Sequence, residues 1–161
     1  MWKNLLFLLL LLVISRFIGL PANFSPLLAL AVFMPRLTDD KRIQHLLPVS
    51  IIAFTNLFLD PVNGFILTTM LIVFAVAPFV SRYTQSIVWG SVSAIAIWHL
   101  VVNGAVWFSG GGSLLQTYIA AIPFDFKLAL STWLYLALFH FAERLMMTVG
   151  QSNTKLFDRI V

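Results

Sequence analysis

Long apolar runs, separated by short polar turns, constrain this chain more than any other feature of its sequence. The 161 residues are 60% hydrophobic and 10% charged. An apolar run of about 20 residues spans the hydrocarbon core of a bilayer as a helix. Helices are expected because a spanning segment must satisfy its own backbone hydrogen bonds, and the alternating pattern of a membrane β-barrel is absent. The sequence therefore predicts an all-α, polytopic membrane helix bundle.

Turn-forming residues divide the apolar runs into about six helices, one of which is short. The full-length helices are expected at Leu5–Leu20, Ile43–Leu59, Phe65–Val80, Ser86–Phe108 and Phe126–Met147. Residues 1–147 then form the transmembrane bundle, and residues 148–161 form a polar cytoplasmic tail. Lys3 and the apolar run after it resemble a signal peptide. A cleavage site after Ala22 would place the unsuitable Leu20 three residues before the cut, so this segment is expected to remain as a helix.

Two apolar segments are too short to cross a bilayer alone. Pro26–Met34, with Ser25 as its cap and Pro26 at the first helical position, covers only about half of the bilayer at ~1.5 Å per residue. It is expected to tilt, to continue past the next proline, or to lie partly inside the bundle. Leu114–Ile122 is expected to be re-entrant or interfacial and to end at Pro123.

The positive charges are distributed unevenly between the two ends of these helices. With the N-terminus in the cytoplasm, eight of the ten Lys and Arg residues fall inside, and only Arg16 and Lys127 fall outside. The inside residues are Lys3, Arg36, Lys41, Arg42, Arg82, Arg144, Lys155 and Arg159. Cytoplasmic loops of membrane proteins carry an excess of Lys and Arg. The sequence therefore predicts a multi-pass protein of the bacterial inner membrane with both termini in the cytoplasm.

The composition excludes several kinds of site. The chain has no cysteine, which rules out disulfides, thiolate metal sites and cysteine nucleophiles. His45, His99 and His140 are expected at different depths, so their spacing gives no metal site. The sequence contains no zinc-protease, serine-hydrolase or phosphate-loop motif, and neither an enzyme activity nor a cofactor is predicted. The net charge of +4 comes from residues at the membrane edges, so nucleic acid is not an expected partner.

Small residues recur on one predicted helix. Ser86, Gly90 and Ala94 follow one another at four-residue spacing. Small residues at this spacing let two helices approach closely in lipid. This stripe therefore predicts helix packing and carries no chemistry.

Polar residues concentrate towards the predicted outer end of the bundle. Asn56 and Asp60 lie one helical turn apart, and His99, Asn103 and Trp107 also share a helical face. Polar groups in lipid are costly and usually face the bundle interior or a wet cavity. The sequence therefore predicts a small-molecule pocket near the outer face. Its expected lining residues are Asn23, Asn56, Asp60, His99, Asn103, Trp107 and Tyr118.

Within this pocket, Asp60 would supply charge, the amides hydrogen bonds and the aromatic rings a stacking face. Asp60 and Asn103 are expected to approach the same cavity at similar depth. Structural roles are equally open for these side chains. Asn56 and Asp60 can order the turn at the end of the third predicted helix. His99 and Asn103 can join helices through hydrogen bonds. Trp107 and Tyr118 can anchor the chain at the membrane interface.

Three segments of the chain resemble a known family. Pro21–Ala31, Asn103–Gly111 and Tyr118–Phe124 resemble a family of small bacterial membrane proteins of uncharacterised function. That family is related to the substrate-binding (S) subunits of energy-coupling-factor vitamin transporters. The resemblance covers most of the chain. It implies a six-helix bundle with both termini in the cytoplasm and a pocket near the outer face.

The chain also departs from the S subunits. Its first predicted helix is rich in Leu and lacks the Ala-x-x-x-Ala motif through which S subunits dock their partner. It begins with Met1 and Trp2 rather than with the Met-His loop of the cobalt and nickel members. It lacks the cysteine ligand of some cobalamin transporters. Metal ions and cysteine-ligated cobalamin are therefore disfavoured as substrates.

The residues and the resemblance together favour a membrane transport or solute-binding protein for a small, vitamin-like organic molecule. The alternative is a non-catalytic accessory subunit of a larger membrane complex, because a short chain with a half-length helix could depend on a partner for cover. An intramembrane enzyme is a third hypothesis. The expected partners are the lipid bilayer and either a small-molecule substrate or a larger complex.

Overall fold

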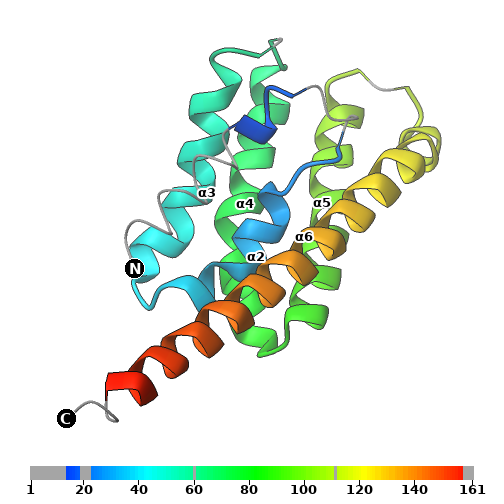
Figure 1. Cartoon of the computed structure of the whole chain (residues 1–161). Coiled ribbons are helices and arrows are strands. Elements are labelled where there is room, and N and C mark those ends of the chain that lie inside the picture. The colour runs from blue at the N-terminus through cyan, green and yellow to red at the C-terminus, as the bar shows by residue number, and fades with distance from the viewer. Residues whose placement is uncertain (1–13, 19–22, 60, 111, 158–161) are drawn as a thin grey trace.

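The computed structural model of the chain consists of helices packed into one bundle (Figure 1). It describes residues 14–18, 23–59, 61–110 and 112–157, with side chains described as far as residue 145. That part of the chain contains five helices and no strand. They are α2 (Leu27–Leu37), α3 (Lys41–Asn56), α4 (Gly64–Thr84), α5 (Ile87–Phe108) and α6 (Leu114–Phe157). The all-α prediction is confirmed, whereas most of the expected first helix lies outside the described residues.

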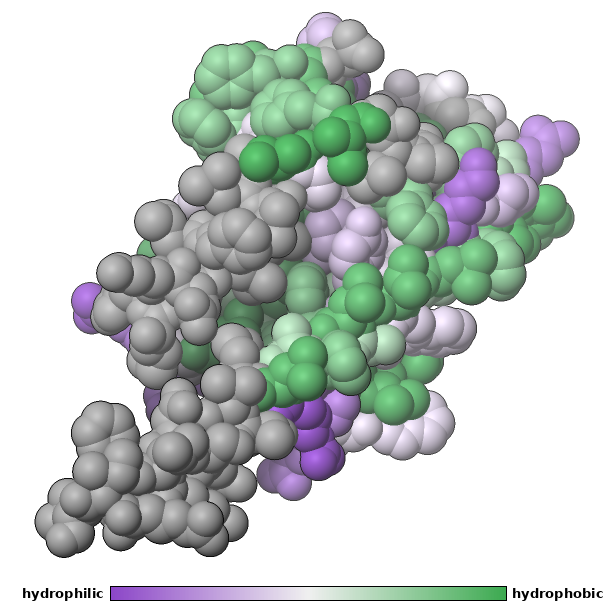
Figure 2. Space-filling model, viewed as in Figure 1, coloured by the Kyte–Doolittle hydropathy of each residue, from purple (hydrophilic) through white to green (hydrophobic). Residues whose placement is uncertain are grey.

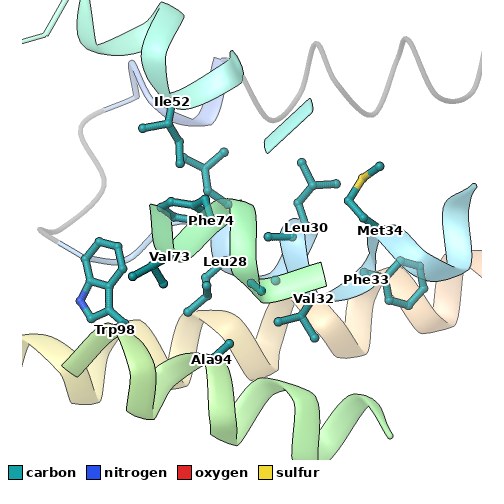
Figure 3. Close-up of a cluster of buried hydrophobic side chains, with 14 of the residues drawn as sticks. Leu28, Leu30, Val32, Phe33, Met34, Ile52, Val73, Phe74, Ala94 and Trp98 are labelled. Carbon is teal, nitrogen blue, oxygen red and sulfur yellow. The ribbon is translucent and has the colours of Figure 1, made fainter. Parts of the chain in front are cut away.

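The short helix α2 lies at the centre of the bundle and contacts each of the other four helices (Figure 1). Every residue from Leu27 to Met34 is at most 2% exposed. Figure 3 shows side chains of α2 within a cluster that includes Ile52 of α3, Phe74 of α4 and Trp98 of α5. At ~1.5 Å per residue, a helix of 11 residues covers about half of a bilayer. Of the outcomes expected for this segment, α2 continues past Pro35 to Leu37 and lies inside the bundle.

A hydroxyl group of α6 fixes the turn that leads into α2. The buried Ser131 Oγ accepts a hydrogen bond from the Ser25 backbone N–H at 3.4 Å and lies 3.3 Å from the Ser25 carbonyl. Asn23 in the same turn has a φ of 64°, a left-handed conformation that Asn tolerates better than most residues. Ser25 Oγ accepts from the Leu27 N–H at 3.3 Å, and Pro26 occupies the N-cap, one residue before the expected position.

Side-chain caps fix the starts of the next three helices. Asp40, Asn63 and Ser86 each accept hydrogen bonds from backbone N–H groups in the first turn of α3, α4 and α5. α3 ends at Asn56, about one turn earlier than the sequence predicts. α4 continues through the expected polar link as far as Thr84, so that link is shorter than predicted. The predicted range of α5 agrees with the structure to within one residue.

A glycine allows α4 and α5 to pack closely. A Cβ atom added to Gly90 would lie 2.9 Å from the Cα of Ser81 on α4. Ala94, one turn further along α5, is 1% exposed. α4 and α5 share the most extensive contact of any helix pair described. The small-residue stripe therefore packs as the sequence predicts.

The prediction that a short segment ends at Pro123 is wrong. α6 runs without interruption from Leu114 through Pro123 to Phe157, and so includes both the expected last helix and most of the expected tail. Figure 1 shows the first turns of α6 nearly end-on, whereas the rest of the helix runs as a long diagonal. A proline inside a helix removes one backbone hydrogen bond and bends the helix without necessarily ending it. That Leu114–Ile122 does not itself cross the bilayer stays a prediction.

Three of the described helices are long and apolar enough to cross a membrane, namely α4, α5 and residues Leu114–Leu145 of α6. Figure 2 shows hydrophobic side chains along the diagonal of α6, with hydrophilic ones towards its two ends. Large exposed apolar residues such as Phe79, Trp89 and Phe141 extend this surface over several helices. A surface of this kind is characteristic of a membrane protein, as the sequence predicts. α3 is too polar and short to be among the three.

Candidate functional site

An open cavity of about 550 Å³ lies between α4, α5 and α6. It lies towards the upper end of the bundle in Figure 1, the end that holds the α3–α4 and α5–α6 connections. None of the lining residues carries a formal charge. They are Asn23, Ile66, Met70, Trp98, Val102, Asn103, Val106, Gln116, Thr117, Ala120, Ala121 and Phe124.

A buried carboxylate borders this cavity. Asp125 on α6 is 7% exposed and accepts hydrogen bonds from two side chains of the cavity wall. Trp98 Nε1 donates to its Oδ1 at 3.1 Å, and Asn103 Nδ2 donates to its Oδ2 at 2.7 Å. His99 Nδ1 lies 2.7 Å from the same Oδ2. Three side chains of α5 therefore converge on one carboxylate of α6.

The helical repeat explains this convergence. His99 and Asn103 are one turn apart on α5. Trp98, next to His99, packs its ring against Phe74 of α4 and reaches Asp125 through its ring nitrogen. Asn103 Nδ2 also lies 3.2 Å from His99 Nδ1, so the two α5 residues and Asp125 form a closed triangle of contacts. A charged group in a membrane bundle almost always has such partners, because an unpaired one is costly. We refer to Trp98, His99, Asn103 and Asp125 as the Asp125 cluster.

Tyr118 covers one side of this cluster. Its ring meets the His99 ring edge-on, with centroids 5.3 Å apart. Its hydroxyl donates to the Leu100 carbonyl of α5 at 2.7 Å. A Cβ atom on Gly104 would lie 3.1 Å from this hydroxyl oxygen, so the absence of a side chain at 104 makes room for the contact. The beginning of α6 is thereby tied to α5 directly above the His99–Asp125 pair.

The structure distributes the seven predicted pocket residues among different places. Asn23 and Asn103 line the cavity. His99 and Tyr118 lie beside it through the contacts given above. Trp107 does not line the cavity and is 41% exposed. Asp60 lies outside the described residues, so its expected approach to Asn103 stays a prediction.

Asn56 is predicted to line the pocket, but its side chain contacts Arg16 and the backbone of α3. Its Oδ1 accepts from Arg16 Nη2 at 3.4 Å, and its Nδ2 donates to the Ile52 carbonyl at 3.0 Å. Arg16 Nε also donates to the buried Thr55 Oγ1 at 3.4 Å. Asn56 is not among the residues that line the cavity. Asn56 joins α3 to the segment before α2.

Sequence reasoning missed Trp98 and Asp125 as members of the site. Asp125 follows Pro123 and precedes Lys127, a pattern that indicates a turn unless the helix is known to continue through the proline. Once α6 is continuous, Asp125 becomes an acidic residue within a candidate membrane span, which is in itself a signal of function. Trp98 adjoins the predicted His99, but its apolar surroundings in the sequence give no sign of its polar partner.

The cluster does not resemble a metal site. No group of three or more His, Cys, Asp or Glu side chains suited to a metal ion occurs in the described part of the chain. Asp125 is surrounded by N–H donors of Trp98 and Asn103, whereas a hard cation requires several oxygen ligands. The carboxyl group of Asp125 is therefore held by N–H donors of α5.

The fold and the site define a helical membrane protein with an uncharged cavity beside a buried carboxylate–histidine pair. Residues 1–153 match DUF6580, a family of unknown function, and the chain belongs to that family. No curated protein and no solved structure matches the chain. The functional argument therefore depends on the geometry of the site.

Proposed function

We propose that the chain is a membrane transport or solute-binding protein for a small, uncharged organic molecule. The observation that carries this proposal is the cavity of about 550 Å³ with the Asp125 cluster at its wall. Small-molecule pockets are usually clefts of about 300–1,000 Å³ with mostly apolar walls and a few placed polar groups. The cavity has these properties.

The wall of the cavity indicates the class of molecule. The amides of Asn23, Asn103 and Gln116 and the hydroxyl of Thr117 offer hydrogen bonds, and the other lining residues are apolar. Trp98 and Phe124 provide aromatic surface. A wall without charge favours a neutral ligand, since a charged one would lose its hydration without gaining an ionic partner. A heteroaromatic, vitamin-like molecule fits these requirements.

We place the protein in the bacterial inner membrane as a multi-pass protein, with the cavity facing outwards. The described basic residues support this orientation. Arg36, Lys41, Arg42 and Arg82 lie at the end of the bundle opposite the cavity, where the α2–α3 and α4–α5 connections lie (Figure 1). An excess of Lys and Arg marks the cytoplasmic side. Both termini are then cytoplasmic, and the expected first helix adds a crossing.

The resemblance to vitamin-transporter S subunits agrees with this function, although the docking motif on the first helix is missing. The accessory-subunit alternative rested on a half-length helix that needs cover. Leu27–Met34 of α2 are already enclosed by the other helices of the chain. This burial favours the solute-binding function over the accessory role.

Copurification tests the proposal. Ala121 lines the cavity, and Ala137 lies exposed on the same helix away from it. The wild-type protein, Ala121→Phe and Ala137→Phe are purified from rich-medium cultures in mild detergent. Each is then denatured, and the released small molecules are identified by mass spectrometry. We expect one neutral compound with the wild type and Ala137→Phe, and its loss from Ala121→Phe, in which a phenyl ring fills the cavity.

Two results contradict the proposal. One is equal recovery of the compound from Ala121→Phe, which would place its site outside the cavity. The other is that no compound is enriched with the wild type over Ala121→Phe, while both variants keep the elution profile and helical content of the wild type.

A further inference from the structure

We infer that His99 and Asp125 form a proton-binding site beside the cavity, so that binding of the ligand is coupled to a proton. The coupling rests on the proposed function, whereas the proton site itself does not. The distance of 2.7 Å between His99 Nδ1 and Asp125 Oδ2 is that of a strong hydrogen bond. It requires a proton between these two atoms.

The pair has room for one further proton. Among the described residues, both close polar contacts of His99 are to Nδ1: the proton on this atom is donated to Asp125, and the Asn103 amide at 3.2 Å is then a neighbour without a hydrogen bond to it. No hydrogen bond within the described chain uses Nε2. With the proton held between Nδ1 and Oδ2 only, the pair carries a net negative charge. A proton from water that adds to Nε2 makes an imidazolium beside a carboxylate and brings the net charge to zero. No bond between heavy atoms changes in this step.

The surroundings favour the exchange of that proton. A buried net charge is costly in a low-dielectric bundle, and protonation removes it. Histidine is the side chain that ordinarily changes its charge in the physiological pH range. Because the two groups interact strongly, the proton belongs to the pair as a whole. Asp125 already accepts from Trp98 and Asn103, so a metal ion lacks the oxygen ligands that it needs there.

Few other titratable groups face the pair from the helices packed against α5. On α6, Tyr118 covers the His99 ring, and Lys127 lies over the Phe124 ring at 5.8 Å. The charged residue of α2, Arg36, is bonded to Glu143 near the opposite end of the bundle. On α4, the charged residue Arg82 contacts His45 at that same end, where Tyr83 also lies. Apart from Tyr118 and Lys127, the charged groups named on α2 and α4 lie at the end of the bundle away from the pair.

Asn103 supplies the connection to the ligand. It lines the cavity, donates to Asp125 Oδ2 at 2.7 Å and lies 3.2 Å from His99 Nδ1. A hydrogen bond to an ionised acceptor is shorter and stronger than one to a neutral acceptor. A change in the charge of the pair therefore changes how firmly the Asn103 amide is held. The affinity for a ligand that hydrogen-bonds to this amide therefore changes when the pair takes up a proton.

The chain permits a direct test of the proton site. It has three histidines, so a variant with His45→Gln and His140→Gln retains His99 alone. This variant is reconstituted in lipid bilayers with isotope-labelled histidine, and nitrogen resonances are followed by solid-state NMR as the pH is lowered. We expect Nδ1 to stay protonated and Nε2 to gain a proton. Adding Asp125→Asn should change this titration, because the carboxylate that shares a proton with Nδ1 is lost.

Either of two results overturns the proton site. One is a His99 ring that does not titrate while the protein stays folded, and the other is a titration that Asp125→Asn leaves unchanged. If Asp125→Asn does not fold, labelled aspartate in the single-histidine variant replaces it. Magnetisation transferred from the His99 nitrogen should then reach the carboxyl carbon of Asp125. The chemical shift of this carbon should remain that of an ionised carboxylate when Nε2 is protonated. A protonated carboxyl group at that point would overturn the ion pair.

The coupling is tested without the ligand. In the single-histidine variant, Ala121→Phe fills the cavity, whereas Ala137→Phe adds the same ring on the outer face of α6. We expect Ala121→Phe to shift the titration of His99 and Ala137→Phe to leave it in place. Equal titration in both variants would overturn the coupling. A shift in the absence of any copurified compound would retain the proton site and reject the proposed ligand.

Discussion

The side-chain amide of Asn103 lies 2.7 Å from the Oδ2 atom of Asp125, so a residue of the cavity wall donates directly to a buried carboxylate. α5 supplies the donor and α6 supplies the acceptor. The same contact therefore packs two helices together and shapes the cavity. Substitutions that change stability and substitutions that change ligand recovery distinguish the packing role from the binding role.

Asp125→Asn should lower the stability of the bundle. The Asn side chain has the same shape, but it replaces one acceptor oxygen with an NH₂ group, which then faces either the Trp98 donor at the Oδ1 position or the Asn103 donor at the Oδ2 position. A buried donor left without an acceptor costs about 1–3 kcal/mol. Thermal unfolding in detergent should show a lower midpoint for this variant, with the exposed Asp39→Asn as its control. Equal midpoints would mean that the carboxylate does not hold α5 to α6.

Gly90→Ala should separate α4 from α5. The added methyl group would lie 2.9 Å from the Cα of Ser81, and a backbone atom cannot move aside as a flexible side chain can. Overpacking of this kind costs about 1–3 kcal/mol. Gly64→Ala, at the start of α4, is the matched control because nothing lies within 4 Å of the added atom. If both variants unfold at the same temperature as the wild type, the close approach at Gly90 is not required.

Substitutions at Asn23 should distinguish its backbone role from its side-chain role. Its φ of 64° favours Asn or Gly over other residues. Asn23→Ala should therefore destabilise the protein by about 1 kcal/mol, whereas Asn23→Gly should keep near-native stability. Both variants lose the amide that lines the cavity. If the amide binds the ligand, both should copurify less of it, and full retention by Asn23→Gly would assign Asn23 to the turn alone.

The orientation of the bundle can be tested because the chain has no native cysteine. Ser113→Cys lies in the exposed α5–α6 connection, and Ser152→Cys lies near the end of α6. An impermeant thiol reagent added outside intact cells should label position 113 and spare position 152. Permeabilised cells provide the control in which both positions react. Labelling of position 152 alone would reverse the cavity side, and labelling of both positions in intact cells would contradict the cytoplasmic C-terminus.

The sequence predicts the helices of this bundle better than it predicts their ends. The run around Ile87–Phe108 is long, apolar and capped by Ser86, so local signals suffice to place α5. The start of the short helix is also predictable from Ser25 and Pro26, whereas its end is not, because α2 continues through Pro35 to Leu37. Pro123 misleads, because a proline marks a helix end in most contexts but only bends α6 here. Tertiary packing decides between these outcomes.

The site shows the same limit. His99 and Asn103 are predictable from polarity and helical spacing, because polar side chains inside a membrane helix need partners. Asp125, the partner of both residues, is not predictable in this way, because its position depends on α6 continuing through Pro123. Asn56 shows that polarity does not identify the partner, since it pairs with Arg16 rather than with the cavity. Polar residues can be found from sequence, but their pairing is set by the packing of distant helices.

An experimental structure of the protein purified from native membranes tests the central claim most directly. We predict density for a small molecule in the cavity between α4, α5 and α6, in contact with the Asn103 amide and away from the lipid-facing surface. The same density should be absent from Ala121→Phe. A wild-type cavity filled only by lipid tails, with an unrelated molecule bound elsewhere on the bundle, would contradict the account.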